Sequence, residues 1–291
     1  MTTKPLPAPG RAGAGTAGPG TLGPGGLIWQ LGGDVRNVLL LLHTGALQAL
    51  HPAIGSALTD LSSAFSDPWK RLWRSSFDIL GSVYDEDAAA TGRRVRDYHH
   101  DVRGRTPSGA DYHALSPGPF VWAHTTFVYS LVVASDAFGR PLTGAQKEQV
   151  WAEGLQWYAR YGLGTRGLPP DWAAAEAYIV RVVEEELTHV TAGAAAVRSV
   201  SGRTATPFRW APQPVWDRIG PPFGRLETWV AAALLPPVLR DRLCLGWTRW
   251  DAVRFAVFRR AVRLLAQALP RERRYLPRAR DGWRRVSPGG R

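Results

Sequence analysis

The chain has 291 residues, 45% of them hydrophobic, which is enough to bury a large core in one or two domains. Its single cysteine, Cys244, excludes an intramolecular disulfide framework and any multi-cysteine metal or iron–sulfur site, and favours a reducing, cytoplasmic compartment. Residues 268–291 contribute half of the net charge of +12, because they contain eight arginines and only two acidic residues, Glu272 and Asp281. Without zinc-finger spacing or an aromatic and basic repeat, we expect no nucleic acid partner, and favour a solvated tail or an acidic partner.

The first predicted elements are a leader and an apolar helix. Residues 1–26 hold eight glycines and five prolines but no aromatic residue and no apolar run, which predicts a disordered leader without a signal peptide. Asp34 then caps a helix expected over residues 35–50, which Pro52 prevents from continuing. This helix is apolar nearly all round and, at roughly 16 residues, short for a membrane span, so we expect it inside a bundle.

The dipeptide Asp67-Pro68 predicts the start of a helix over residues 68–84, because it combines a capping carboxylate with proline at the first helical position. One face of this helix is aromatic. The other is polar and consists of Arg71, Arg74, Ser75 and Asp78. The polar face is either a solvated cationic stripe or a site where two guanidinium groups bind a carboxylate or another anion.

A further helix is predicted over residues 85–104. Because a helix turns about 100° per residue, Val95, His99 and Val102 share its buried face, and the adjacent His100 falls on the hydrated face. His99 is therefore predicted to point inward. It is either a core histidine bonded to a backbone carbonyl or a ligand of haem iron, non-haem iron or zinc.

Two later helices carry the remaining histidines of interest. The helix expected over residues 117–138 contains His124, a second inward histidine that is a cavity wall, a hydrogen-bond donor or a ligand; its polar residues favour a buried helix over a transmembrane one. The helix expected over residues 171–192 contains Glu186 and His189 as a Glu-x-x-His pair. Di-iron sites need this pair on two helices and it occurs once here, so a non-haem iron or di-iron protein is kept as an alternative.

The remaining sequence is predicted to be helical at about 225–235, 237–244 and 250–268, with turn-rich breaks before residue 225 and at Pro236-Pro237. No alternating strand pattern is found, which predicts an all-α fold. We expect a single multi-helix domain over residues 27–268 with a buried cofactor pocket between helices, followed by an arginine-rich tail over residues 269–291. The 13 tryptophans suit an interior that lines a large flat ligand or seals long helices together.

Seven short segments carry a family pattern. They are QALHP at 48–52, DPWKRLWRS at 67–75, HHDVRG at 99–104, YHAL at 112–115, WAHTT at 122–126, LPPVLR at 235–240 and LPR at 276–278. In order and combination, the chain resembles the MpaB-type oxygenase family, whose relatives include the rubber oxygenases called latex clearing proteins. The resemblance covers roughly residues 30 to 280.

The resemblance implies a helical fold that holds haem b, with His99 as the iron ligand and Arg71, Arg74 and Ser75 as catalytic residues on the opposite side of the pocket. It also makes Arg71 and His124 candidates for cofactor binding. The implied activity is a haem-dependent oxygenase that acts with dioxygen on an apolar organic substrate. Arg74 and Ser75 stand where rubber oxygenases have lysine and threonine, and the leader lacks an export signal, so we expect a small intracellular substrate instead of rubber.

A non-enzymatic alternative starts from the basic C-terminal segment. In this hypothesis the family pattern reflects the fold alone, and the arginines of residues 268–291 contact nucleic acid or an acidic protein.

Overall fold

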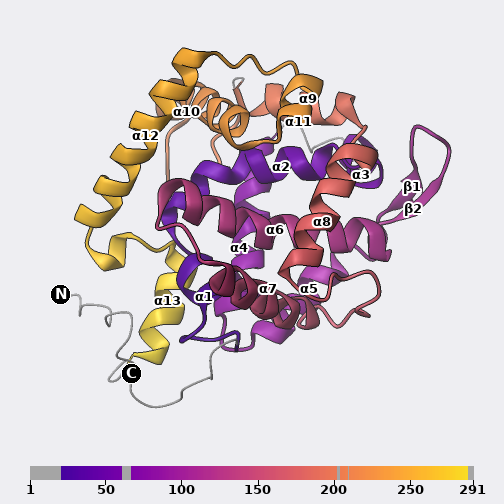
Figure 1. The fold of residues 1–291 in the computed structure, drawn as a ribbon, viewed down its shortest axis with the longest axis horizontal. Coiled ribbons are helices and arrows are strands. Elements are labelled where there is room, and N and C mark those ends of the chain that lie inside the picture. Colours follow the sequence, from indigo (N-terminus) through magenta and orange to yellow (C-terminus); the bar gives the residue numbers. More distant parts are fainter. Residues whose placement is uncertain (1–20, 61–66, 202–203, 209, 288–291) are drawn as a thin grey trace.

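The computed structural model describes residues 21–60, 67–201, 204–208 and 210–287. Over these residues the chain forms thirteen α-helices and one two-stranded sheet, so the all-α prediction is confirmed (Figure 1). The helices are α1 Leu27–Leu31, α2 Leu41–Ala49, α3 Pro52–Asp60, α4 Pro68–Tyr84, α5 Ala88–Asp97, α6 Pro117–Phe138, α7 Gly144–Ala159, α8 Trp172–Arg181, α9 Val190–Ser201, α10 Gln213–Leu234, α11 Pro237–Arg242, α12 Arg249–Ala268 and α13 Pro277–Val286. The antiparallel strands β1 (Arg103–Arg105) and β2 (Asp111–His113) form a small hairpin.

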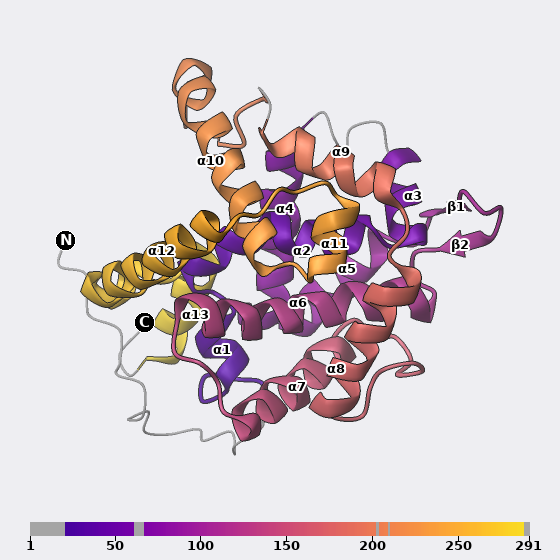
Figure 2. The ribbon, with the colours of Figure 1, turned by 45° about the horizontal axis from the view of Figure 1, so that its top comes forward.

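Helices α2 and α6 lie at the centre of the molecule (Figure 2). α2 packs against α6, α9 and α10, and α6 also packs against α7 and α12. On the other side of the centre, α4 packs against α5 and α13. The β1–β2 hairpin projects from the end opposite to α12 and α13. This arrangement places α4, the C-terminal end of α5 and α6 around the same interior.

The helix starts follow the local sequence signals. Asp87 caps α5 by accepting a hydrogen bond from the backbone N–H of Ala90. Thr143 and Gln146 form a reciprocal capping box at α7. Proline stands at the first position of α4 and of α6. These signals involve residues within one turn of each other, which is why sequence alone finds them.

Two predicted helices end earlier than expected. The helix expected over residues 85–104 ends at Asp97, and Gly104 lies in β1, where a Cβ would come within 2.8 Å of the Tyr112 hydroxyl oxygen. The helix expected over residues 171–192 breaks after a π-helical turn, Val182–Glu186. The cause is Arg242 of α11, whose guanidinium binds the carbonyl oxygens of Val183, Glu184 and Leu187. These side-chain bonds satisfy carbonyls that would otherwise accept from the next helical turn.

Two further boundaries also differ from prediction. Residues Val35–Leu40 form a 3-10 helix before α2 instead of one continuous α-helix. Helix α10 begins at Gln213 and continues through Pro221 and Pro222, where a turn-rich break was expected. Packing holds its first part in place, because Trp216 is only 5% exposed and its indole N–H donates to the Thr204 hydroxyl.

The two ends of the described chain pack on the helical body. Leu22, which lies in the expected leader, is buried and its backbone N–H donates to Gln156; residues 1–20 of that leader lie outside the described residues. The expected solvated tail is instead largely helix α13, packed on α4. Arg278 holds it there through a bidentate pair with Asp85, at 2.7 and 2.5 Å, and Trp283 is buried against Trp29.

Replacing Arg278 with alanine tests this docking. We expect the free energy of unfolding to fall by about 2 kcal/mol, because Asp85 loses a charge-assisted pair in a half-buried position. Arg284→Ala on the same helix is the matched control, with an expected loss below about 0.5 kcal/mol, since its pair with Asp281 is solvent-exposed. Urea unfolding of both variants measures the difference, and equal losses would contradict it.

The same pair predicts a pH dependence. Burial tends to raise the pKa of Asp85, but hydrogen bonds from Arg278 and Thr91 outweigh it and hold the pKa below 3.8. A carboxyl whose pKa is lowered on folding stabilises the folded state above its unfolded pKa and loses this contribution as the pH falls through its folded pKa. The cost of Arg278→Ala should therefore shrink as the pH falls below about 4.

Within the described ranges, no single helix is both long and apolar enough to cross a membrane. Residues Val35–Ala49 and Pro52–Asp60 reach that length and composition only as a pair, and the pair is bent by 102°. The cytoplasmic location stays a prediction.

Candidate functional site

A cavity of about 860 Å³ lies between α2, α3, α4, α6 and the end of α5. Its walls are mainly aliphatic and aromatic side chains, and its volume falls in the range of cavities that hold cofactors and drug-sized ligands. Every residue that the sequence proposed for cofactor or oxygen chemistry lines this one cavity: Arg71, Arg74, Ser75, His99 and His124. Residues from three separate helical segments are thus brought together.

His99 lies two residues after the end of α5, and its side chain is oriented by the backbone of that helix. Its Nδ1 lies 2.8 Å from the carbonyl oxygen of Val95. Because a carbonyl only accepts hydrogen bonds, Nδ1 carries the proton and Nε2 keeps its lone pair. The ring also packs edge-on against Phe120, with centroids 6.0 Å apart. A ring that is fixed at Nδ1, and whose Nε2 has no hydrogen-bond partner among the described residues, is the arrangement that metal-binding histidines use.

The electrostatic surroundings keep this imidazole neutral. Burial is the largest influence on the His99 pKa and lowers it; the bond to Val95 opposes this, and the nearby positive charge of Arg71 lowers it further. The neutral form is the one that binds metals. The adjacent His100 differs as predicted, because its side chain is 76% exposed and pairs with Asp101.

The cationic residues reach the cavity from α4. Arg71 is half-buried, and its pKa is lowered first by burial and then by the neighbouring charge of Arg74. Among the described residues its guanidinium has neither a hydrogen-bond nor an ion-pair partner. Arg74 and Ser75 are exposed although they line the cavity, which places them where it opens to solvent. Arg71 therefore offers free donors inside the cavity to an anion or an oxygen atom.

His124 lies deeper than His99 and is held differently. Its Nε2 lies 2.8 Å from the carbonyl oxygen of Gly154, and its ring packs edge-on against Trp157, Tyr158 and Tyr161. Burial lowers its pKa to about 4. Its Nδ1 has no hydrogen-bond partner among the described residues. This geometry makes His124 part of the cavity wall.

The cavity also contains polar groups for which no role was predicted. The Gln48 side-chain amide on α2 donates to the Thr126 hydroxyl on α6 at 2.9 Å, and the hydroxyls of Thr44 and Ser130 are 2.7 Å apart. Thr44, Gln48 and Ser130 line the cavity. The sequence could have indicated these groups, because they are polar residues within the apolar helices α2 and α6 and buried polar groups need partners.

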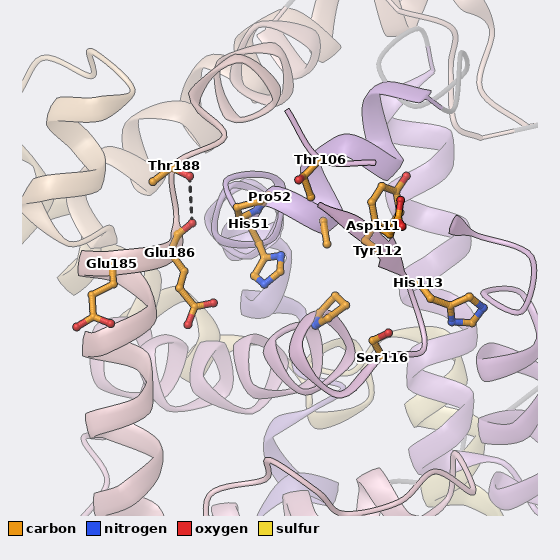
Figure 3. Close-up of a pocket in the computed structure, with 12 residues that line it drawn as sticks. His51, Pro52, Thr106, Asp111, Tyr112, His113, Ser116, Glu185, Glu186 and Thr188 are labelled. Atoms are coloured by element: carbon orange, nitrogen blue, oxygen red, sulfur yellow. Dashed lines mark hydrogen bonds between the residues drawn. The ribbon is translucent and has the colours of Figure 1, made fainter. Parts of the chain in front are cut away.

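The residues of the non-haem alternative do not converge. Glu186 pairs with Arg181 at 2.5 Å, and together with His51 it borders a second pocket, of about 430 Å³ (Figure 3). His99 and His124 line the other cavity. No group of three or more histidine, cysteine, aspartate or glutamate side chains in the described part of the chain is placed to hold a metal ion. The non-haem alternative therefore lacks a protein ligand set in this arrangement.

The chain is thus an all-α protein with an apolar cavity. The cavity is lined by a histidine that is fixed at Nδ1 and by an arginine that has no partner in the described part of the chain. Comparison with protein families gives a match over residues 29–264 to the family described as ER-bound oxygenase mpaB/B'/Rubber oxygenase, catalytic domain. The chain belongs to this oxygenase family, which confirms the resemblance found in the sequence. No curated protein and no solved structure gives a significant match.

Proposed function

We propose that this chain is a haem-dependent oxygenase in which His99 would hold the iron of haem b through Nε2 and a small apolar organic molecule is the substrate. The observation that carries the proposal is the His99 side chain, which is fixed at Nδ1 by Val95 and has a free Nε2 in a cavity of about 860 Å³. Membership of an oxygenase family supports dioxygen as the second substrate.

The residues present fit this cofactor in three respects. The neutral imidazole suits iron, the aliphatic and aromatic walls suit a porphyrin ring, and Arg71 supplies an unpaired cation for a propionate or for dioxygen. When bound, haem supplies the redox chemistry with dioxygen. The protein contributes the position of the ligand, the exclusion of water by the apolar walls, and hydrogen-bond donors from Arg71, Arg74 and Ser75. The apolar lining also favours an apolar substrate.

Absorption spectra of the purified protein in oxidised, reduced and carbon-monoxide-bound forms test the proposal. We expect a Soret band that shifts on reduction and again on addition of carbon monoxide, because a haem protein that reacts with dioxygen would also bind carbon monoxide. Absence of the band after expression with ample haem and after reconstitution would refute the proposal. Stoichiometric iron without a pyridine haemochrome would favour the non-haem alternative.

Arg71→Ala separates cofactor binding from oxygen chemistry. We expect the haem to remain bound, while the rate of dioxygen consumption by the reduced protein falls by roughly 100-fold, the usual cost of losing a donor to a reacting oxygen atom. Arg93→Ala is the control, because Arg93 is exposed on α5 and does not line the cavity. Equal rates in both variants would remove Arg71 from the proposed mechanism.

A further inference from the structure

Helix α12 packs on the helical body by one face only. Phe255 and Ala266 are 7% exposed, and Phe258 and Val262 lie against the same apolar cluster, which α6 and α10 complete. Arg259 strengthens the attachment by donating to the carbonyl oxygens of Asp136 and Ala137 at the end of α6. Figure 2 shows α12 on the outside of the molecule, with its opposite face turned away from the other helices.

The outer face of α12 is apolar along most of its length. Its exposed apolar side chains are Trp250 (73% exposed), Val253 (55%), Val257 (65%), Leu264 (54%) and Leu265 (67%). At 100° per residue these five positions lie within about 120° of arc, on the side of the helix that faces away from Phe255. From Trp250 to Leu264 the stripe is about 21 Å long at 1.5 Å per residue. We refer to these five residues as the α12 stripe.

The exposed charged residues of α12 are all arginines. Arg254 lies within the arc of the stripe, and Arg249 and Arg260 lie beside it. All three are exposed and have no ion-pair partner among the described residues. The single acidic residue of the helix is Asp251, and its carboxylate accepts hydrogen bonds from Thr248 and Trp229. An exposed apolar stripe with a tryptophan and basic flanks is the pattern of helices that lie in the plane of a membrane interface.

We propose that α12 docks the protein onto an anionic lipid surface, with the stripe inserted at the level of the headgroups and acyl-chain ends. Arg254 and Arg260 then contact the anionic headgroups, because their long side chains reach outward from an apolar face. The contact is peripheral, since only one face of one helix takes part. The net charge of +12 adds a longer-range attraction to such a surface.

The exposed arginines of α12 favour a lipid surface over a second copy of this chain as the partner of the stripe. A twofold dimer through the stripe would bring the same patch of both copies together. Arg254 and Arg260 of one copy would then face the same arginines of the other, with no exposed acidic residue on α12 to pair with them. An anionic bilayer supplies both the apolar environment and the negative charge.

The test is co-sedimentation of the full chain with vesicles of phosphatidylcholine alone and with vesicles that also contain phosphatidylglycerol. We expect binding at least tenfold tighter to the anionic vesicles, and weaker binding to them at high salt.

The double variant Val257→Ser/Leu264→Ser should lose at least tenfold in affinity for the anionic vesicles. Arg254→Gln/Arg260→Gln should lose the preference for anionic lipid. Val180→Ser, at a similarly exposed valine on α8, should bind like the unmodified chain.

All of these substitutions are at exposed positions, and circular dichroism verifies the fold of each variant. Absence of vesicle binding, or equal binding by all variants, would overturn the proposal. So would a dimer in light scattering that Val257→Ser/Leu264→Ser converts to a monomer, because the stripe would then be an interface between copies. Binding that appears only after removal of residues 1–20 would also overturn it, since that segment would then cover the stripe in the intact chain.

Discussion

Substitution of His99 by alanine is expected to abolish haem retention, while substitution of the adjacent His100 leaves it nearly intact. His99 lines the cavity with a free Nε2, whereas the His100 side chain is exposed and pairs with Asp101. Both residues lie in the same turn after α5 and are exchanged for the same residue, so effects on the local backbone largely cancel. The two variants therefore differ mainly in the imidazole that faces the cavity.

The haem content per protein, measured as the pyridine haemochrome, gives the readout. Imidazole added to His99→Ala should restore a Soret band, because it takes the place of the removed ring. This rescue distinguishes loss of the ligand from collapse of the cavity. Equal haem content in the two histidine variants would remove His99 as the ligand and make His124 the next candidate, although its Nε2 is already bonded to Gly154.

The inward position of His99 and the exposed position of His100 could be predicted from helix geometry, although helix α5 ends at Asp97, before either histidine. The reason is that the turn after α5 continues along a helical path: the N–H of His99 bonds to the carbonyl of Arg96, and that of His100 to the carbonyl of Asp97. The two side chains thus keep nearly the angular separation of a helix. The starts of α4, α5 and α6 could be predicted for a similar reason, since capping is local.

Features that depend on distant partners could not be predicted. A count of charges makes residues 268–291 a basic tail, but it does not show that Arg278 meets Asp85, 193 residues away in the chain. The break before α9 depends in the same way on Arg242, which is 55 residues beyond the carbonyl of Leu187. The convergence of Arg71, His99 and His124 on one cavity came from the family resemblance, because spacing within single helices does not place one helix beside another.

A buried carboxyl group that does not itself line the cavity could not be predicted either. Glu227 of α10 is 0% exposed, and its Oε2 accepts a single hydrogen bond, from the backbone N–H of Leu42 in the first turn of α2. Its Oε1 has no partner among the described residues. Burial is the main influence on this group and raises its pKa from 4.5 to about 8, with the Leu42 bond opposing. Glu227 is therefore protonated in the folded chain at neutral pH.

This protonation predicts that Glu227→Gln makes the protein more stable at alkaline pH. Between pH 4.5 and about 8 the unfolded chain has released the Glu227 proton and the folded chain keeps it, so stability falls as the pH rises through this window. Glutamine has the shape of the protonated acid, still accepts from Leu42 and does not ionise. The stability gain of the variant should grow from near zero at pH 4.5 to on the order of 4 kcal/mol at pH 8, by proton linkage.

Urea unfolding at pH 5, 6.5 and 8 measures the gain, and the ionisation of the histidines cancels because both proteins contain them. Glu153→Gln is the matched control at an equally buried glutamate. The Glu153 carboxylate accepts hydrogen bonds from the N–H groups of Leu27 and Ile28 and from the Gln149 amide. A glutamine there has only one acceptor oxygen, so this variant should lose stability where Glu227→Gln gains it. A gain for Glu227→Gln that does not change with pH would show that the folded chain holds Glu227 ionised.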